Sequence, residues 1–121
     1  MRKETENWWK QANRDMESAK KIMELGEYHV SAFLSQQAVE KALKALLIET
    51  NSSFPRIHDV AELSRRVKAP SKIIESCAMI NPAYTSTRYP DVASDFNKNE
   101  VEEILKCAKE ILEWTKKELK L

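Results

Sequence analysis

The fold of this chain is decided by one stretch, Gln36-Gln37-Ala38-Val39-Glu40-Lys41-Ala42-Leu43-Lys44-Ala45-Leu46-Leu47. Its alanine, valine and leucine residues follow the spacing of an amphipathic helix. Gln37, Glu40 and Lys44 are spaced by three and four residues, so they share one face beside the apolar stripe. An unpaired polar group at a packed face costs about 1–3 kcal/mol. These side chains are therefore expected either to brace the core or to line a polar cleft.

Helical spacing continues on both sides of this stretch. It predicts a first helix over residues 4–25, ended by Gly26 as a left-handed cap, and a second helix over residues 27–49. The apolar stripe of the second helix is wide, which indicates a central helix with neighbours on more than one side. Trp8 is assigned to the buried stripe of the first helix. Trp9 lies about 100° further round, so it is expected to cover a helix edge or to meet another chain.

The rest of the chain predicts shorter helices separated by breaks. Asp59 is a suitable N-cap for a short helix, and Ser71 is a suitable N-cap for the next one. Residues 84–97 show no helical spacing and are expected to form a long loop. Asn99 and Glu102 form a capping pair that is expected to open the last helix.

The composition agrees with a helical chain. One glycine and four prolines interrupt 121 residues that are rich in Glu, Lys, Ala and Leu. We therefore expect an all-α protein with a single domain over residues 1–121. The expected architecture is an up-and-down bundle of four main helices plus a short connecting helix.

The charge and hydropathy of the chain argue against nucleic-acid-binding and membrane-spanning proteins as classes of function. The formal net charge is +1, from 20 basic and 19 acidic residues, which argues against a broad nucleic-acid-binding face. No stretch approaches the ~20 apolar residues of a membrane span, and the first residues lack the apolar segment of a signal peptide. A cytoplasmic location without membrane contact is expected. Cys77 and Cys107 fit no metal-ligand spacing, so reduced thiols and no metal site are expected.

Two further polar groups of residues are candidates for a site. Tyr84, Arg88 and Tyr89 combine a guanidinium that suits phosphate with aromatic faces on which a base can stack. In the alternative reading, Arg88 pairs with a helix carboxylate and Tyr89 packs the loop down. His58 directly precedes the cap Asp59, where it either titrates in catalysis or fixes the loop.

The order of these motifs resembles that of HEPN domains, named for higher eukaryotes and prokaryotes nucleotide-binding. The specific parts of the resemblance are a Gln-x-x-Glu-Lys-x-x-Lys-Ala block over residues 37–45 and the tripeptide Arg88-Tyr89-Pro90. Other residues match in the same order along nearly the whole chain: Trp9, Ala12, Asp15, Ala19, Tyr28, Ala32, Phe33, His58, Asp59, Val60 and Leu63.

The resemblance implies a small helical bundle that pairs as a homodimer. Prokaryotic HEPN proteins are often encoded beside a minimal nucleotidyltransferase and act with it, in some cases as a toxin–antitoxin pair. The implied ligand is a nucleotide, and no other cofactor is expected.

The candidate site combines the polar residues of the loop with those of the second helix. Arg88 is expected to contact phosphate, and Tyr84 or Tyr89 is expected to stack on a base. The polar face of the second helix is expected to supply further contacts or to brace the cleft through its three polar residues, Gln37, Glu40 and Lys44.

One large branch of the HEPN family consists of metal-independent ribonucleases, in which an Arg is followed, after four to six residues, by a His. This chain departs from that pattern, because the residues five to seven positions before His58 are Asn51, Ser52 and Ser53, and no His follows Arg88. We therefore expect a non-catalytic module. One alternative is a diverged ribonuclease acting on RNA, with His58 as base and Arg88 stabilising the phosphorane. The other alternative is a purely structural interaction subunit.

Overall fold

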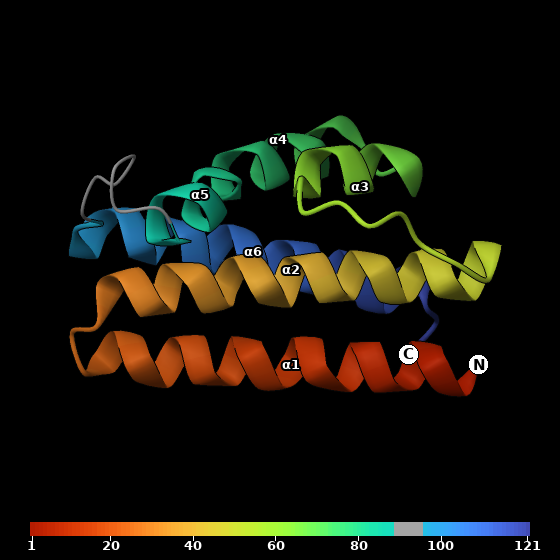
Figure 1. The fold of residues 1–121 in the computed structure, drawn as a ribbon, viewed down its shortest axis with the longest axis horizontal. Helices are drawn as coiled ribbons and strands as arrows, with labels where there is room; N and C mark the ends of the chain where they lie inside the picture. Colours follow the sequence, from red (N-terminus) through yellow and green to blue (C-terminus); the bar gives the residue numbers. More distant parts are fainter. Residues whose placement is uncertain (89–95) are drawn as a thin grey trace.

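The computed structural model describes residues 1–88 and 96–121, and within these ranges every regular element is a helix. The described elements are α1 (Lys3–Glu24), α2 (Tyr28–Asn51), α3 (Val60–Arg66), α4 (Ser71–Ile80), α5 (Pro82–Arg88) and α6 (Lys98–Glu118). The long helices α1, α2 and α6 lie side by side, and the short helices α3, α4 and α5 cover one side of them (Figure 1). The prediction of an all-α bundle is confirmed.

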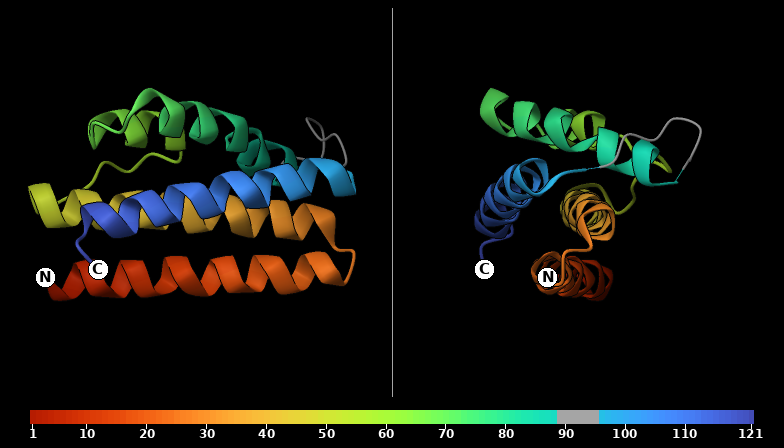
Figure 2. Two further views of the ribbon diagram at one scale, coloured as in Figure 1. Left: turned by 180° about the vertical axis from the view of Figure 1, so that it is seen from behind. Right: turned by 90° about the vertical axis from the view of Figure 1, so that its left-hand side faces the viewer.

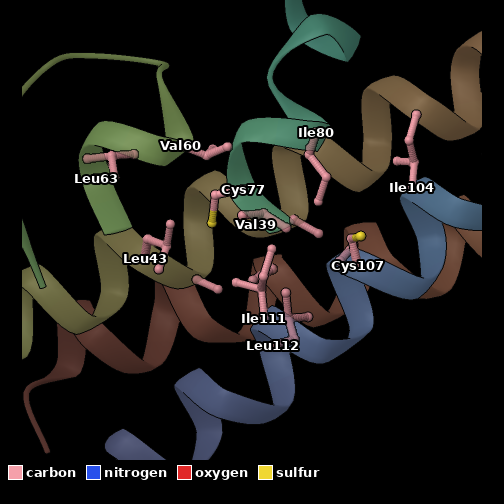
Figure 3. Close-up of a cluster of buried hydrophobic side chains, with 14 of the residues drawn as sticks. Val39, Leu43, Val60, Leu63, Cys77, Ile80, Ile104, Cys107, Ile111 and Leu112 are labelled. Carbon is pink, nitrogen blue, oxygen red and sulfur yellow. The ribbon is translucent and has the colours of Figure 1, made fainter. Parts of the chain in front are cut away.

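Helix α2 is the centre of the bundle. It packs against each of the other five described helices, and most of its side chains are buried. Val39 and Leu43 face Ile111 and Leu112 of α6, with Cys77 of α4 above them (Figure 3). The expectation of a central helix with neighbours on several sides is confirmed. A helix enclosed in this way must satisfy any polar side chain from within the protein, because little water reaches it.

Two predicted helix ends are confirmed. Gly26 has a φ of 81°, and its N–H donates to Met23 O at 2.9 Å while Glu27 N–H donates to Ile22 O at 3.2 Å. These two bonds form a Schellman motif, which closes α1 and turns the chain into α2. At the start of α3, the side chain of Asp59 accepts a hydrogen bond from Glu62 N at 3.0 Å, as expected of an N-cap.

The last helix begins earlier than the sequence analysis predicts. Asn97, not Asn99, is the N-cap of α6, and it forms a complete capping box with Glu100. Both pairs have the same spacing, but only the earlier start places Phe96 and Val101 at the two positions of a hydrophobic staple. Phe96 packs against the core and Val101 is fully buried, so core packing selects this register.

Two other expectations around the short helices are wrong. Ser71 is the first residue of α4 and Pro70 holds the N-cap position. Residues 84–88, expected to belong to a loop over residues 84–97, lie in helix α5 (Pro82–Arg88), and residues 89–95 of that expected loop lie outside the described residues. Proline fits the first turn of a helix because that turn needs no donor from its N–H. Pro82 therefore starts α5 directly after α4, and Tyr84 N donates to Asn81 O at 3.1 Å across the junction.

The two tryptophan rings of α1 lie on opposite edges of its buried stripe. The stripe consists of Thr5, Ala12, Met16 and Ala19. Trp9 packs against the main core, whereas Trp8 contacts Phe54 edge to face at 4.8 Å between ring centroids. Trp8, which the spacing assigns to the buried stripe, is therefore only partly buried and lies against Phe54.

Among the described residues, no helix is both long enough and apolar enough to cross a membrane.

We predict that Gly26→Ala lowers the free energy of unfolding by about 1 kcal/mol, because an L-residue resists the left-handed conformation. A β-carbon at this position meets nothing within 4 Å, so the cost is purely conformational. Urea unfolding measures it, with Gly26→Asn as the control that retains most of the stability because Asn tolerates this conformation. An unchanged midpoint for Gly26→Ala would contradict the assignment of the cap.

Candidate functional site

A buried carboxylate on α2 organises the candidate site. Glu40 is only 5% exposed, and its Oε2 accepts a hydrogen bond from Lys44 Nζ at 3.0 Å. Its Oε1 accepts from Gln36 Nε2 at 3.1 Å and lies 3.0 Å from His58 Nδ1. Gln36 Nε2 also lies 3.2 Å from the backbone oxygen of His58. Three donors thus surround one carboxylate, and the network attaches the segment before α3 to the central helix.

Aromatic rings cover the cationic end of this network. Lys44 Nζ lies 5.1 Å from the ring centroid of Phe54 and 5.9 Å from that of Trp8. Both distances allow attraction between the ammonium and the ring faces. Lys44 is 4% exposed, so its charge is balanced inside the protein by Glu40 and by these rings.

His58 brings the network to the surface. Its side chain is about half exposed, and its ring stacks on Tyr84 of α5 with 4.6 Å between centroids and 15° between planes. A carboxylate can only accept a hydrogen bond, so Nδ1 of His58 must carry the proton that points to Glu40. In the neutral ring this leaves Nε2 unprotonated, so Nε2 can accept a proton or a hydrogen bond.

A second set of hydrogen bonds holds the two stacked rings in place. Asp59 Oδ1 accepts from Asn81 Nδ2 at 2.8 Å, and Asn81 Oδ1 accepts from Val60 N at 2.9 Å. The start of α3 is thereby attached to the residue that joins α4 and α5. Hydrogen bonding from the backbone N–H of Glu62 lowers the pKa of Asp59 below its ordinary value, with Asn81 adding to the effect.

The polar residues expected on α2 divide into two groups. Glu40 and Lys44 are buried and paired with each other, so the structure places them as braces of the site and not along an open cleft. Gln37 is only partly buried, and its Nε2 donates to Gln36 Oε1 at 2.7 Å. Of the predicted α2 residues, Gln37 therefore lies nearest to solvent.

The predicted residues around α5 are only partly described. Tyr84 is half-buried and stacked on His58. The backbone of Arg88 ends α5 one turn after Tyr84, and its side chain lies outside the described residues, as does the whole of Tyr89. The spacing of residues along the sequence does not predict the stacking of His58 on Tyr84. This stacking depends on helix α5, whose residues show no helical periodicity of apolar side chains.

The cysteines take no part in this site. Cys77 and Cys107 are both free and buried, as expected. Burial raises the pKa of the Cys77 thiol to about 12, so it remains protonated and a poor nucleophile near neutral pH. Within residues 1–88 and 96–121, no group of three His, Cys, Asp or Glu side chains is arranged to hold a metal ion.

Comparison with known proteins agrees with the helical architecture. The family model of the HEPN domain matches residues 5–119. This chain belongs to the HEPN family. A protein of Methanocaldococcus jannaschii named "Putative toxin MJ1304" is 32% identical to it over 92% of this chain and 85% of its own length.

Two solved structures have the same fold. The crystal structure of TT1696 from Thermus thermophilus superposes with a TM-score of 0.86 and is 27% identical over 94% of this chain and 97% of its own. The crystal structure of ST0689, described as an archaeal HEPN homologue, has a TM-score of 0.80 and 34% identity. It covers 96% of this HEPN chain and 97% of its own.

We predict that Glu40→Gln destabilises this HEPN domain by about 3 kcal/mol, because it leaves the Lys44 ammonium buried without a counter-charge. The control Asp15→Asn removes a more exposed ion pair, Asp15 with Lys41 at 2.7 Å, and is expected to cost at most about 1 kcal/mol. Adding Lys44→Met to Glu40→Gln should restore part of the loss. Urea unfolding measures the free energy of unfolding of each variant. Equal losses of this free energy in Glu40→Gln and Asp15→Asn would contradict the claim that Glu40 balances the buried charge of Lys44.

Proposed function

We propose that this chain is the HEPN subunit of a toxin–antitoxin-type pair. In this proposal it forms a homodimer, binds a nucleotide and associates with a minimal nucleotidyltransferase as its partner. Membership of the HEPN family and the name of the M. jannaschii relative support the toxin-type assignment. The homodimer, the nucleotide and the nucleotidyltransferase follow from what the family resemblance implies.

The observation that carries the ligand proposal is the pair of stacked rings at the surface. His58 is fixed from beneath by Glu40 and from the side by Tyr84, so its ring is held in one orientation before any ligand arrives. The binding of a ligand then costs little side-chain entropy, because the His58 ring is already ordered. A ring edge with an unprotonated Nε2, next to an aromatic face, suits a nucleobase that both stacks and donates a hydrogen bond.

The other proposed contacts surround this pair. The register of α5 carries Arg88 one turn after Tyr84, where we propose a contact with phosphate, and we propose Tyr89 as a second stacking ring. Gln37 is the proposed polar contact on the α2 side of the rings. We assign Glu40 and Lys44 the bracing role, because their burial leaves them no surface to offer a ligand.

We propose binding without catalysis because the chain lacks the spacing of the ribonuclease branch. The positions that would hold its Arg before His58 are occupied by Asn51, Ser52 and Ser53. None of these three residues supplies a guanidinium. Ser52 is the left-handed C-cap of α2, with a φ of 66°, so this segment forms the end of that helix.

One observation favours a second candidate, a diverged ribonuclease. A carboxylate on Nδ1 of a histidine fixes the tautomer that acid–base catalysis requires, and Glu40 does this for His58. In such a reaction Nε2 of His58 removes the proton of a ribose 2′-hydroxyl. The oxygen then attacks the adjacent phosphorus, the bond from phosphorus to the 5′-oxygen breaks, and the 5′-oxygen takes a proton from water, which gives a 2′,3′-cyclic phosphate and a 5′-hydroxyl. Arg88 would stabilise the negative charge of the phosphorane.

We predict measurable heat when ATP, GTP or their monophosphates are titrated into the protein in a calorimeter. Tyr84→Ala and Arg88→Ala should each weaken binding by about tenfold or more, because one removes stacking and the other a charged phosphate contact. Tyr84→Phe should retain most of the affinity, and Arg14→Ala, at an exposed site on α1, should leave it unchanged. The absence of heat at millimolar ligand would contradict nucleotide binding.

Incubation with single-stranded and structured RNA separates binding from catalysis. The proposed binding function predicts no cleavage by the wild type. Cleavage that falls at least about 100-fold in His58→Ala and in Arg88→Ala would establish the ribonuclease candidate instead. Cleavage that is equal in the wild type and in both variants would come from a contaminating nuclease.

A further inference from the structure

Two polar atoms of the candidate site, His58 Nε2 and Gln37 Oε1, have no hydrogen-bond partner among the described residues. Within those residues every buried side-chain oxygen and nitrogen is hydrogen-bonded, so Gln37 Oε1 is open to solvent. The site lies where α5 and the start of α3 meet α2, and α1 lies on the other side of the bundle (Figure 2). These two atoms are therefore available to a ligand.

The buried carboxylate of Glu40 fixes the direction of the Gln36 amide. A carboxylate and a backbone carbonyl can only accept hydrogen bonds. Gln36 Nε2 lies 3.1 Å from Glu40 Oε1 and 3.2 Å from the backbone oxygen of His58, so both of its N–H groups point to acceptors. Gln36 Oε1 is left on the other side of the amide, where it accepts from a donor.

The direction of the Gln37 amide follows from that of Gln36. Gln36 Oε1 can only accept, so the group that lies 2.7 Å from it must be the nitrogen of the Gln37 amide. Gln37 Oε1 is thereby held on the solvent side of the contact as an acceptor. The Gln37 nitrogen keeps one further N–H, so this amide can also donate.

The same carboxylate fixes the direction of the His58 ring. Nδ1 carries its proton towards Glu40 at 3.0 Å, so Nε2 of the neutral ring can only accept. A half-turn of the ring would replace Nδ1 by a carbon at Glu40, so this hydrogen bond also decides which way the ring faces. His58 Nε2 is therefore the unambiguous acceptor at the surface, and Gln37 Oε1 is the second.

Two acceptors at one site favour the exocyclic amino group of a nucleobase. An amino group on the base edge donates, and its two N–H groups can serve both acceptors. An oxo group in the same position has only lone pairs, so it leaves His58 Nε2 facing another acceptor without a proton between them. A site that hydrogen-bonds an N–H of its ligand discriminates strongly against an analogue that lacks this N–H.

We propose that His58 Nε2 and Gln37 Oε1 select nucleotides whose base carries an exocyclic amino group, as in adenine and cytosine. Hypoxanthine and uracil, which have an oxo group in its place, are disfavoured. The proposal rests on the nucleotide binding proposed above and names the class of base. Stacking on Tyr84 is available to every base, so it contributes affinity, whereas the two acceptors contribute the selectivity.

Matched nucleotides test the selectivity. AMP and IMP have the same ring size, sugar and phosphate and differ in the amino or oxo group, and so do CMP and UMP. Calorimetric titration at about pH 8.5, where an imidazole is ordinarily neutral, should give at least about tenfold tighter binding of AMP than of IMP. CMP should likewise bind more tightly than UMP. Guanine carries both groups, so GMP does not separate them.

Variants test the two acceptors. His58→Phe keeps a ring for stacking on Tyr84 but removes Nε2, so the ratio of AMP to IMP affinity should fall to about one. Gln37→Met removes the second acceptor and should lower the ratio only in part. The same substitutions at exposed residues of α2 and α1, His29→Phe and Gln11→Met, should leave the ratio unchanged.

Glu40→Gln tests the origin of the fixed directions. A carboxamide can donate as well as accept, so it no longer forces one orientation on His58 and Gln36. The ratio of AMP to IMP affinity should therefore fall, whereas Asp15→Asn should retain the wild-type ratio. A loss of folded protein lowers both affinities equally and leaves their ratio unchanged, so this measurement separates the positioning of His58 from the stability of the domain.

The outcomes separate this proposal from the one on which it rests. No binding of any of the four monophosphates at millimolar concentration would overturn nucleotide binding and base selection together. Equal affinities for AMP and IMP, or tighter binding of IMP, would overturn base selection alone. A preference for AMP that persists in His58→Phe would overturn the role of Nε2. A preference that disappears in His58→Phe and persists in His29→Phe would establish it.

Discussion

The structure depends on the burial of one negative charge. An unpaired carboxylate inside a protein costs several kcal/mol, so Glu40 is stable at 5% exposure only because Lys44, Gln36 and His58 all point to it. Those partners come from the central helix and from the segment before α3. Trp8 of α1 and Phe54 then cover the ammonium. A single buried group therefore sets the position of a surface histidine.

This constraint gives a physical meaning to the Gln-x-x-Glu-Lys-x-x-Lys block of the HEPN family. Helix α2 is enclosed by five other helices, so its polar residues satisfy one another instead of reaching water. The residues of the block point to different neighbours. Glu40 and Lys44 form a buried pair with each other, whereas Lys41 forms an ion pair with Asp15 of α1 at 2.7 Å. The same few residues thus attach α2 to α1 on one side and support the stacked rings on another.

The sequence predicted features that depend on local spacing and missed those that depend on distant packing. The long helices, the turn at Gly26 and the cap at Asp59 all follow from patterns within a few residues. Helix α5 has only seven residues, too few to show a period, and the stacking of Tyr84 on His58 depends on it. The start of α6 was missed although the sequence carries its signal, because only Asn97 as N-cap places Phe96 and Val101 at the two positions of a hydrophobic staple. By contrast, spacing showed that Glu40 and Lys44 share a face, but not that aromatic rings from elsewhere cover it.

The most direct test of the account is the protonation of the His58 ring, read by ¹⁵N NMR in the wild type and in Glu40→Gln. The buried carboxylate predicts that neutral His58 carries its proton on Nδ1 and leaves Nε2 bare. In Glu40→Gln this preference should weaken, because a carboxamide can donate as well as accept. A wild-type spectrum with the proton on Nε2, or one that is unchanged by Glu40→Gln, would contradict the claim that Glu40 orients the site.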